Sequence, residues 1–138
     1  MNKYFRFVVA ATLACAGMAH AADLTVEVAG LKDASGKLLV AVFDRADTFL
    51  KQPVRTAAAD AQSGAVRIVV AGLPAGDYAV SVFKDANGNG KLDKNPVGMP
   101  IEPYGFSNDA AGSYGPPSFK AAAVHLPAAG ASATIKLR

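Results

Sequence analysis

Apolar and polar residues alternate with a period of two along most of this chain. In the first run, Leu24, Val26 and Val28 share one face, whereas Thr25 and Glu27 take the other. Such alternation is the pattern of a strand with one buried face, so each run predicts a β-strand. Six runs follow the pattern, at residues 24–28, 38–42, 66–70, 78–82, 122–126 and 133–137.

The spacing of these runs predicts the fold class. Short strands separated by Gly- and Pro-containing turns are typical of an all-β antiparallel sandwich, and about seven strands suit a chain of this length. Only residues 44–51 have helical character. There, Asp44 or Asp47 is expected to cap a single turn that packs Phe49 and Leu50 on the sheet edge.

Residues 94–118 form a different kind of segment, rich in proline and glycine. Proline at this density interrupts a strand ladder, so the sequence predicts a long loop. Tyr104, Phe106, Tyr114 and Phe119 indicate that this loop is ordered and packs, because disordered segments are poor in aromatic residues.

The first 21 residues have the pattern of a secretory signal peptide. Lys3 and Arg6 precede an apolar run at 7–18, and Ala19-His20-Ala21 has the small-x-small form that signal peptidase cleaves. The run is shorter than the ~20 residues of a transmembrane helix. We therefore expect cleavage after Ala21, no transmembrane segment in the mature chain, a single domain at 22–138, and a periplasmic or secreted location.

Composition narrows the class of protein further. Cleavage would remove Cys15, the single cysteine, so the exported domain must be held together without a disulfide. Loss of Lys3 and Arg6 would lower the net charge from +3 to +1. So small a net charge gives no electrostatic case for binding nucleic acid or an anionic membrane surface.

The strongest chemical signal is an oxygen-rich loop at residues 85–93. Oxygen-bearing side chains stand at relative positions 1, 3, 5 and 9, and a glycine stands at position 6. This spacing matches the first part of an EF-hand calcium loop, where alternate residues turn oxygen ligands inward. The sequence therefore predicts calcium as a cofactor. The candidate ligands are Asp85, Asn87, Asn89, the carbonyl group of Lys91, and Asp93.

Other features of this loop differ from an EF-hand. Position twelve, where an EF-hand has a bidentate glutamate, is Pro96, so a further ligand such as Glu102 is expected from downstream. The neighbouring Lys84, Lys91 and Lys94 predict weak binding, with a dissociation constant of ~10⁻⁴–10⁻³ M. A metal-free turn remains the alternative, in which Asp and Asn side chains cap their own backbone.

Other candidate chemistry is sparse. His125 falls on a predicted strand, and no serine has the setting of a nucleophile elbow. Because no base–nucleophile pair is apparent, we expect no enzymatic activity. Tyr104, Phe106 and Tyr114 form a candidate groove for a small molecule or carbohydrate, although capping one end of the sandwich is the more common role for apolar side chains.

Four segments resemble a family of exported bacterial proteins, domain of unknown function 2141. They are residues 73–93, Gly98-Met99-Pro100 with Glu102, Tyr104-Gly105-Phe106-Ser107-Asn108, and Pro116-Pro117-Ser118-Phe119. The resemblance implies a periplasmic or secreted domain with an immunoglobulin-like or transthyretin-like sandwich, and it implies no established activity.

Two positions depart from the pattern of that family. Lys84 stands where histidine is common, and Ala86 stands where an acidic residue is common. Both differences weaken a metal site in the loop. The expected function is therefore a non-enzymatic cell-envelope module that binds calcium weakly for stability and contacts another envelope protein or a glycan.

Overall fold

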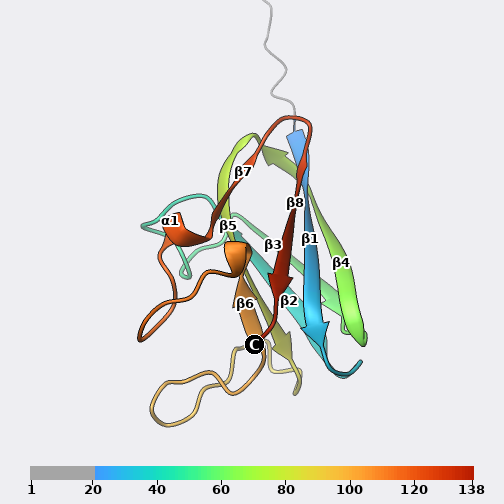
Figure 1. Cartoon of the computed structure of the whole chain (residues 1–138), viewed down its shortest axis with the longest axis vertical. Helices are drawn as coiled ribbons and strands as arrows, with labels where there is room; N and C mark the ends of the chain where they lie inside the picture. The colour runs from blue at the N-terminus through green and yellow to red at the C-terminus, as the bar shows by residue number, and fades with distance from the viewer. Residues whose placement is uncertain (1–20) are drawn as a thin grey trace, which may run out of the picture.

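The computed structural model describes residues 21–138, which form two β-sheets that face each other (Figure 1). The predicted signal peptide, apart from Ala21, lies outside the described residues. One sheet contains β1 (Ala21–Leu31), β4 (Gly64–Pro74) and β8 (Ala131–Lys136). The other contains β2 (Lys37–Phe43), β3 (Arg55–Asp60), β5 (Gly76–Asp85), β6 (Tyr104–Phe106) and β7 (Ala123–Leu126). Two short helical segments lie between β6 and β7, namely η1 (Ser107–Asp109) and α1 (Phe119–Ala122).

The strand order confirms the predicted all-β sandwich and adds one detail. In the first sheet β1 is central and pairs antiparallel with β4 but parallel with β8. In the second sheet β2 and β5 are central, and all pairs are antiparallel. Residues 21–138 thus contain eight strands, where the sequence predicted about seven. No helix in this part of the chain is long and apolar enough to cross a membrane.

The alternating apolar residues form the core between the sheets. Their burial contributes roughly 1.5–3 kcal/mol for each fully buried Val, Leu or Ile side chain, and this is the main force that holds the sheets together. Polar residues on the same strands, such as Asp23 and Glu27 of β1, remain exposed. The fully buried aliphatic residues are Leu24, Val26, Val28, Leu38, Val40, Val42, Leu73, Val80, Val82, Leu126 and Ile135.

One side of the sandwich is closed where β6 meets the end of the chain. Tyr104 and Arg138 exchange two backbone hydrogen bonds, with N···O distances of 3.3 Å and 2.9 Å. The contact leaves no room for a side chain at Gly105, because a Cβ there would lie 2.7 Å from Ile135 Cγ2. A glycine is therefore needed at this position so that the two sheets can approach each other.

The sequence pattern did not predict two of the strands. The edge strand β3 has the sequence RTAAAD, in which small alanines replace the branched residues that mark the other strands. The second, β6, is only three residues long and lies inside the segment predicted to be a loop. Both strands pair with a central neighbour, β2 for β3 and β5 for β6, so the pairing partner rather than local sequence determines them.

The predicted helical turn at residues 44–51 is half correct. The segment forms hydrogen-bonded turns rather than a helix, with Lys51 N donating to Thr48 O at 2.9 Å. Phe49 is buried as predicted and packs edge-on against Phe43 with ring centroids 5.3 Å apart. Leu50, which was expected to pack beside it, is exposed and has a φ of 61°. The left-handed backbone at Leu50 turns its side chain away from the sheet.

Candidate functional site

The oxygen-rich loop begins at the last residue of β5 and curls around the carboxylate of that residue. Asp85 is buried, and its Oδ1 accepts a hydrogen bond from Gly88 N at 3.0 Å. Its Oδ2 accepts one from Gly90 N at 2.7 Å. Both glycines have a φ of 74°, a left-handed conformation that glycine adopts without steric cost. Asp85 therefore fixes the curl of the loop from inside.

The carboxylate of Asp93 closes the other side of the loop. Asn87 Nδ2 donates to Asp93 Oδ2 at 2.5 Å, and Asn89 Nδ2 donates to Asp93 Oδ1 at 2.7 Å. These amide donors, Asn89 first and then Asn87, lower the pKa of the Asp93 carboxyl below its ordinary value. The structure therefore brings together the four side chains that the spacing selected as candidate ligands.

The side chain of Glu102, which the sequence suggested as a further calcium ligand, contacts this loop. Its buried carboxylate accepts hydrogen bonds from two backbone amides, Ala86 N at 2.8 Å and Asp93 N at 2.9 Å. These amides stand near the two ends of the loop. Glu102 therefore clamps the loop closed in this structure, a role that the sequence analysis did not predict.

The base of the loop is supported by the turn between β1 and β2. Lys84 is buried, and its ammonium group pairs with the carboxylate of Asp33 in that turn. The pKa of Asp33 is held well below its usual range, mainly by the hydrogen bond from Lys84. Gly36 packs so closely that a Cβ there would lie 2.4 Å from the carbonyl oxygen of Asp85. Lys84 thus directs its charge to Asp33.

The donor set of the loop limits the metals that it can hold. Among residues 21–138, no group of three or more His, Cys, Asp or Glu side chains is placed to bind a metal ion. The loop itself offers two carboxylates, from Asp85 and Asp93, and two side-chain amides. Such an oxygen-only set suits a hard cation such as calcium and disfavours zinc, which prefers nitrogen and sulfur ligands.

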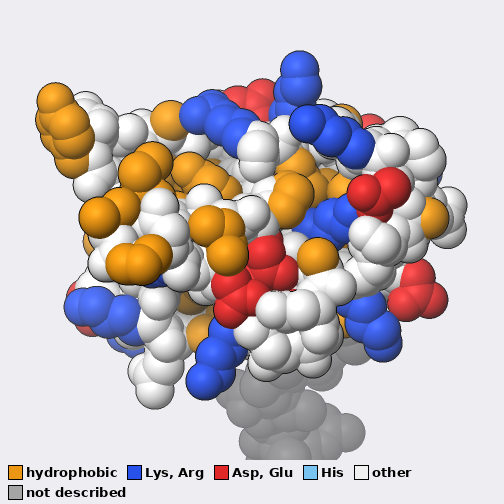
Figure 2. Space-filling view, turned by 90° about the horizontal axis from the view of Figure 1, so that it is seen from below, with side chains coloured by type: hydrophobic (Ala, Val, Ile, Leu, Met, Phe, Trp, Pro, Cys, Tyr) orange, Lys and Arg blue, Asp and Glu red, His pale blue; other side chains and the backbone are white. Residues whose placement is uncertain are grey.

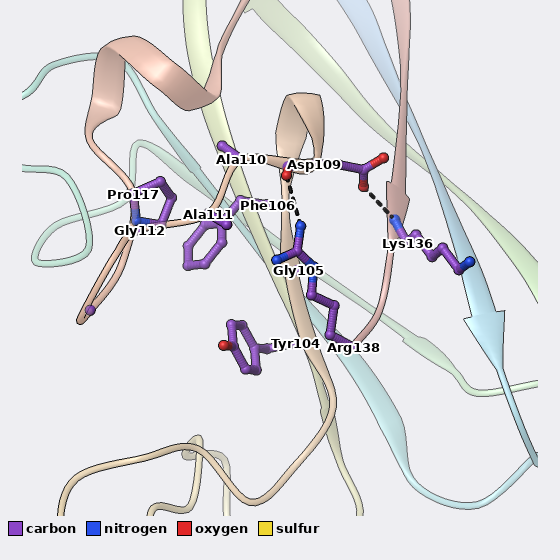
Figure 3. A pocket seen from close by; sticks show the side chains of 11 residues that line it. Tyr104, Gly105, Phe106, Asp109, Ala110, Ala111, Gly112, Pro117, Lys136 and Arg138 are labelled. Atoms are coloured by element: carbon purple, nitrogen blue, oxygen red, sulfur yellow. Dashed lines mark hydrogen bonds between the residues drawn. The ribbon is translucent and has the colours of Figure 1, made fainter.

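The three aromatic residues proposed to line a ligand groove do not share one site. Tyr104 and Phe106 line a small cleft of about 70 Å³, together with Asp109 and Arg138 (Figure 3). Arg138 Nη2 donates to the carbonyl oxygen of Asp109 at 2.9 Å across this cleft. Tyr114 is fully exposed and is not among the lining residues.

Sequence reasoning missed the structural importance of Ser107 and Asn108. Ser107 is completely buried, and its Oγ accepts a hydrogen bond from Val80 N at 2.9 Å. Asn108 Nδ2 donates to Ala123 O at 2.8 Å, with a φ of 59° at Asn108. Val80 lies between the part of β5 that pairs with β7 and the part that pairs with β6. Ser107 therefore fills a gap in the ladder along β5.

These features define a class of protein, a small β-sandwich domain with an oxygen-rich loop at one end. The chain belongs to the DUF2141 family, described as uncharacterized proteins conserved in bacteria, whose family model matches residues 26–135. The predicted family is thus confirmed. No curated protein and no solved structure matches the chain.

Proposed function

We propose that this protein is an exported, non-enzymatic module of the bacterial cell envelope whose loop at 85–93 binds calcium weakly as a structural ion. Export is supported by the signal-peptide pattern of residues 1–21. The absence of enzymatic activity is supported by the placement of the candidate groups. Ser107 is buried against backbone, whereas His125 pairs with Asp77 on the surface.

The observation that carries the calcium proposal is the convergence of side chains on Asp93. The amides of Asn87 and Asn89 both face its carboxylate. Each amide carries an oxygen and a nitrogen on the same carbon. A half-turn about the last side-chain bond therefore puts an oxygen where an N–H group now faces Asp93. A cation would then replace the two N–H donors as the counter-charge.

The surroundings of the loop support weak rather than tight binding. Asp85 and Asp93 are the two acidic residues of the loop itself, and Lys91 and Lys94 are exposed on either side of Asp93. Calcium takes about 6–8 oxygen ligands, so the carbonyl group of Lys91 and water must complete the shell. Because Glu102 already holds the loop closed, the calcium ion would stabilise the loop conformation seen in this structure.

Calcium-dependent thermal unfolding of residues 22–138 tests this proposal. With a dissociation constant of ~10⁻³ M, calcium at about 10 mM should stabilise the domain by about 1.4 kcal/mol through mass action, which raises Tm by several degrees. Magnesium at the same concentration should have a smaller effect, because it demands a tighter octahedral shell.

Two matched variants localise the effect. Asp93→Asn keeps the size of the side chain and removes its charge, so the calcium response should be lost. Asp47→Asn removes an exposed aspartate outside the loop and should keep the full response. Equal calcium responses in the wild-type domain and in Asp93→Asn would reject the loop as the binding site.

The cleft between Tyr104 and Phe106 favours a second candidate function, binding of a small molecule or glycan unit. Aromatic faces and a nearby Arg138 guanidinium are suited to such ligands. The cleft of about 70 Å³ is, however, several times smaller than the roughly 300–1,000 Å³ of typical ligand pockets. Glycan-array binding that is lost in Tyr104→Ala would support this function over the calcium module.

A further inference from the structure

Two asparagine–glycine steps follow each other in the oxygen-rich loop, Asn87-Gly88 and Asn89-Gly90. All four residues are exposed, at the end of the molecule that faces the viewer in Figure 2. Asparagine is chemically labile, and most so before glycine, because glycine has no side chain to shield the backbone nitrogen that follows the asparagine. The loop therefore carries two candidate sites of deamidation, a covalent modification that needs only water.

Deamidation begins when the backbone nitrogen of the glycine loses its proton and attacks the side-chain Cγ of the preceding asparagine. A new N–Cγ bond forms, the Cγ–Nδ2 bond breaks, and Nδ2 leaves as ammonia, so that a cyclic succinimide remains. Water then opens the ring to give aspartate or isoaspartate. The reaction thus consumes water, releases ammonia and replaces a neutral amide by a carboxylate.

In the closed loop, one carboxylate holds both of the attacking nitrogens. Gly88 N donates to Asp85 Oδ1 at 3.0 Å, and Gly90 N donates to Asp85 Oδ2 at 2.7 Å. Asp85 is buried at the end of β5, so its carboxylate is fixed in place. A negatively charged acceptor opposes loss of the amide proton, since deprotonation would put a second negative charge beside it. Asp85 therefore restrains the first step at both asparagines.

A second carboxylate holds both of the amides that would leave. Asn87 Nδ2 and Asn89 Nδ2 donate to Asp93 at 2.5 Å and 2.7 Å. The side-chain oxygens are held as well, because Asn87 Oδ1 accepts from Asn89 N at 3.2 Å and Asn89 Oδ1 accepts from Lys91 N at 3.0 Å. To form the succinimide, each Cγ must move to bonding distance of the glycine nitrogen. That movement displaces the amide from these partners, so it is favoured only when the loop opens.

The other two asparagines of residues 22–138 are poorer sites for this reaction. Asn95 is followed by Pro96, whose backbone nitrogen has no proton to lose. Asn108 is followed by Asp109, whose side chain shields the backbone nitrogen, and Asn108 Nδ2 donates to Ala123 O at 2.8 Å. These two asparagines serve as internal controls for Asn87 and Asn89.

We propose that Asn87 and Asn89 are modification sites that deamidate when the loop opens, and that Asp85 and Asp93 restrain the reaction while the loop is closed. The product puts a carboxylate where an amide donor now faces Asp93, so like charges replace a hydrogen bond. The modified loop should therefore open more readily than the original one. This inference goes beyond the proposed function and does not rest on calcium binding by the loop.

Peptide mass spectrometry of residues 22–138, incubated at neutral pH in EDTA, tests the inference. This domain contains the whole core and all strands except Ala21. The reference is the same domain unfolded in guanidinium chloride. Asn87 and Asn89 should react at least about tenfold more slowly in the folded domain, because a loop that is open less than about a tenth of the time reacts at less than about a tenth of the rate. Asn95 should stay unmodified in both samples.

Two variants test whether loop closure restrains the reaction. Glu102→Gln loosens the clamp without changing an asparagine, a glycine or either restraining aspartate, so it should accelerate deamidation at both sites by about fivefold or more. The matched control Glu27→Gln changes an exposed glutamate of β1 and should leave the rate unchanged. Asp85→Asn should also accelerate the reaction, since one of its acceptor oxygens becomes an N–H donor. If Asp85→Asn does not fold, as judged by its thermal transition, the Glu102 variant decides.

Three outcomes would overturn the inference. The first is no modification of Asn87 and Asn89 in the unfolded chain, and the second is an equal rate in the folded domain and in the unfolded chain. The third is an unchanged rate in Glu102→Gln, because closure of the loop would then not control the reaction. Since these measurements are made in EDTA, failure of the calcium proposal would leave their result unchanged.

Discussion

The sheet core and the loop segment at 86–103 are ordered by different interactions. In the core, apolar side chains such as Leu38 and Val40 are buried between the sheets without any directional bond. In the loop segment, single polar side chains each bind several backbone amides. Glu102 binds two, and Asn95 binds two through one oxygen.

This difference determines how each region tolerates substitution. Hydrophobic packing is non-directional, so the core should accept apolar residues of similar volume. A loop that depends on particular carboxylate and amide oxygens has no such freedom, because each lost acceptor leaves backbone N–H groups without their protein partner. The two regions should therefore be separable in stability experiments.

The largest effect is expected from a cavity in the core. Leu38→Ala removes a fully buried side chain and should lower the free energy of unfolding by about 2–5 kcal/mol. Urea unfolding measures this change. Leu50→Ala, at an exposed leucine, is the matched control and should cost far less. A similar loss in both variants would contradict the assignment of the core.

An intermediate effect is expected from the clamp on the loop. Glu102→Gln replaces one carboxylate oxygen by an N–H donor that faces a backbone N–H group, so it should cost about 1–3 kcal/mol. Hydrogen exchange should show which part of the molecule loses stability in this variant. The amides of Ala86 and Asp93 should exchange much faster, whereas the amide of Val40 should change less.

The control for the clamp is Glu27→Gln, which changes an exposed glutamate that is 4.0 Å from Arg67. Such surface ion pairs contribute little, so exchange in the loop should be unaffected. If Glu102→Gln accelerated exchange equally in the loop and in the central strands, the loop and the core would unfold as one unit. The distinction between the two regions would then fail.

The smallest effect is a pH dependence within the loop. The pKa of Asp93 lies below its ordinary value of 3.8 because Asn89 and Asn87 donate to its carboxylate. A lowered pKa in the folded state stabilises the fold above the unfolded value, and this stability is lost as the pH falls through the folded pKa. In EDTA, Asp93→Asn should therefore be less stable than the wild-type domain at about pH 6, and the gap should narrow below about pH 3.8. A constant gap in urea midpoints over this range would contradict the account.

The fold could be predicted from the sequence wherever a strand carries its own pattern. The alternation at residues 24–28 and 38–42 sufficed for β1 and β2. It failed for β3, whose alanines pack against β2 without a hydrophobic signature, and for β6, whose three residues become a strand only beside β5. Periodicity detects burial on one face, and short or alanine-rich edge strands provide too little of it.

The candidate site was predicted to a similar extent. Spacing selected Asp85, Asn87, Asn89 and Asp93, which the structure brings together in one loop. The clamp by Glu102 and the pairing of Lys84 with Asp33 depend on contacts between distant segments, and no local pattern encodes such contacts. The position of Tyr114 could not be predicted either. Its aromatic side chain suggested a ligand groove, but in the structure the side chain is fully exposed and lines no groove.

The most direct test of the calcium loop is a titration of the ¹⁵N-labelled domain, residues 22–138, followed by NMR. Calcium should shift the backbone amides of Gly88 and Gly90 and the side-chain amides of Asn87 and Asn89. These shifts should saturate with a dissociation constant of ~10⁻⁴–10⁻³ M. Shifts confined to residues outside 85–93, or no shift up to about 10 mM calcium, would show that the loop does not bind calcium.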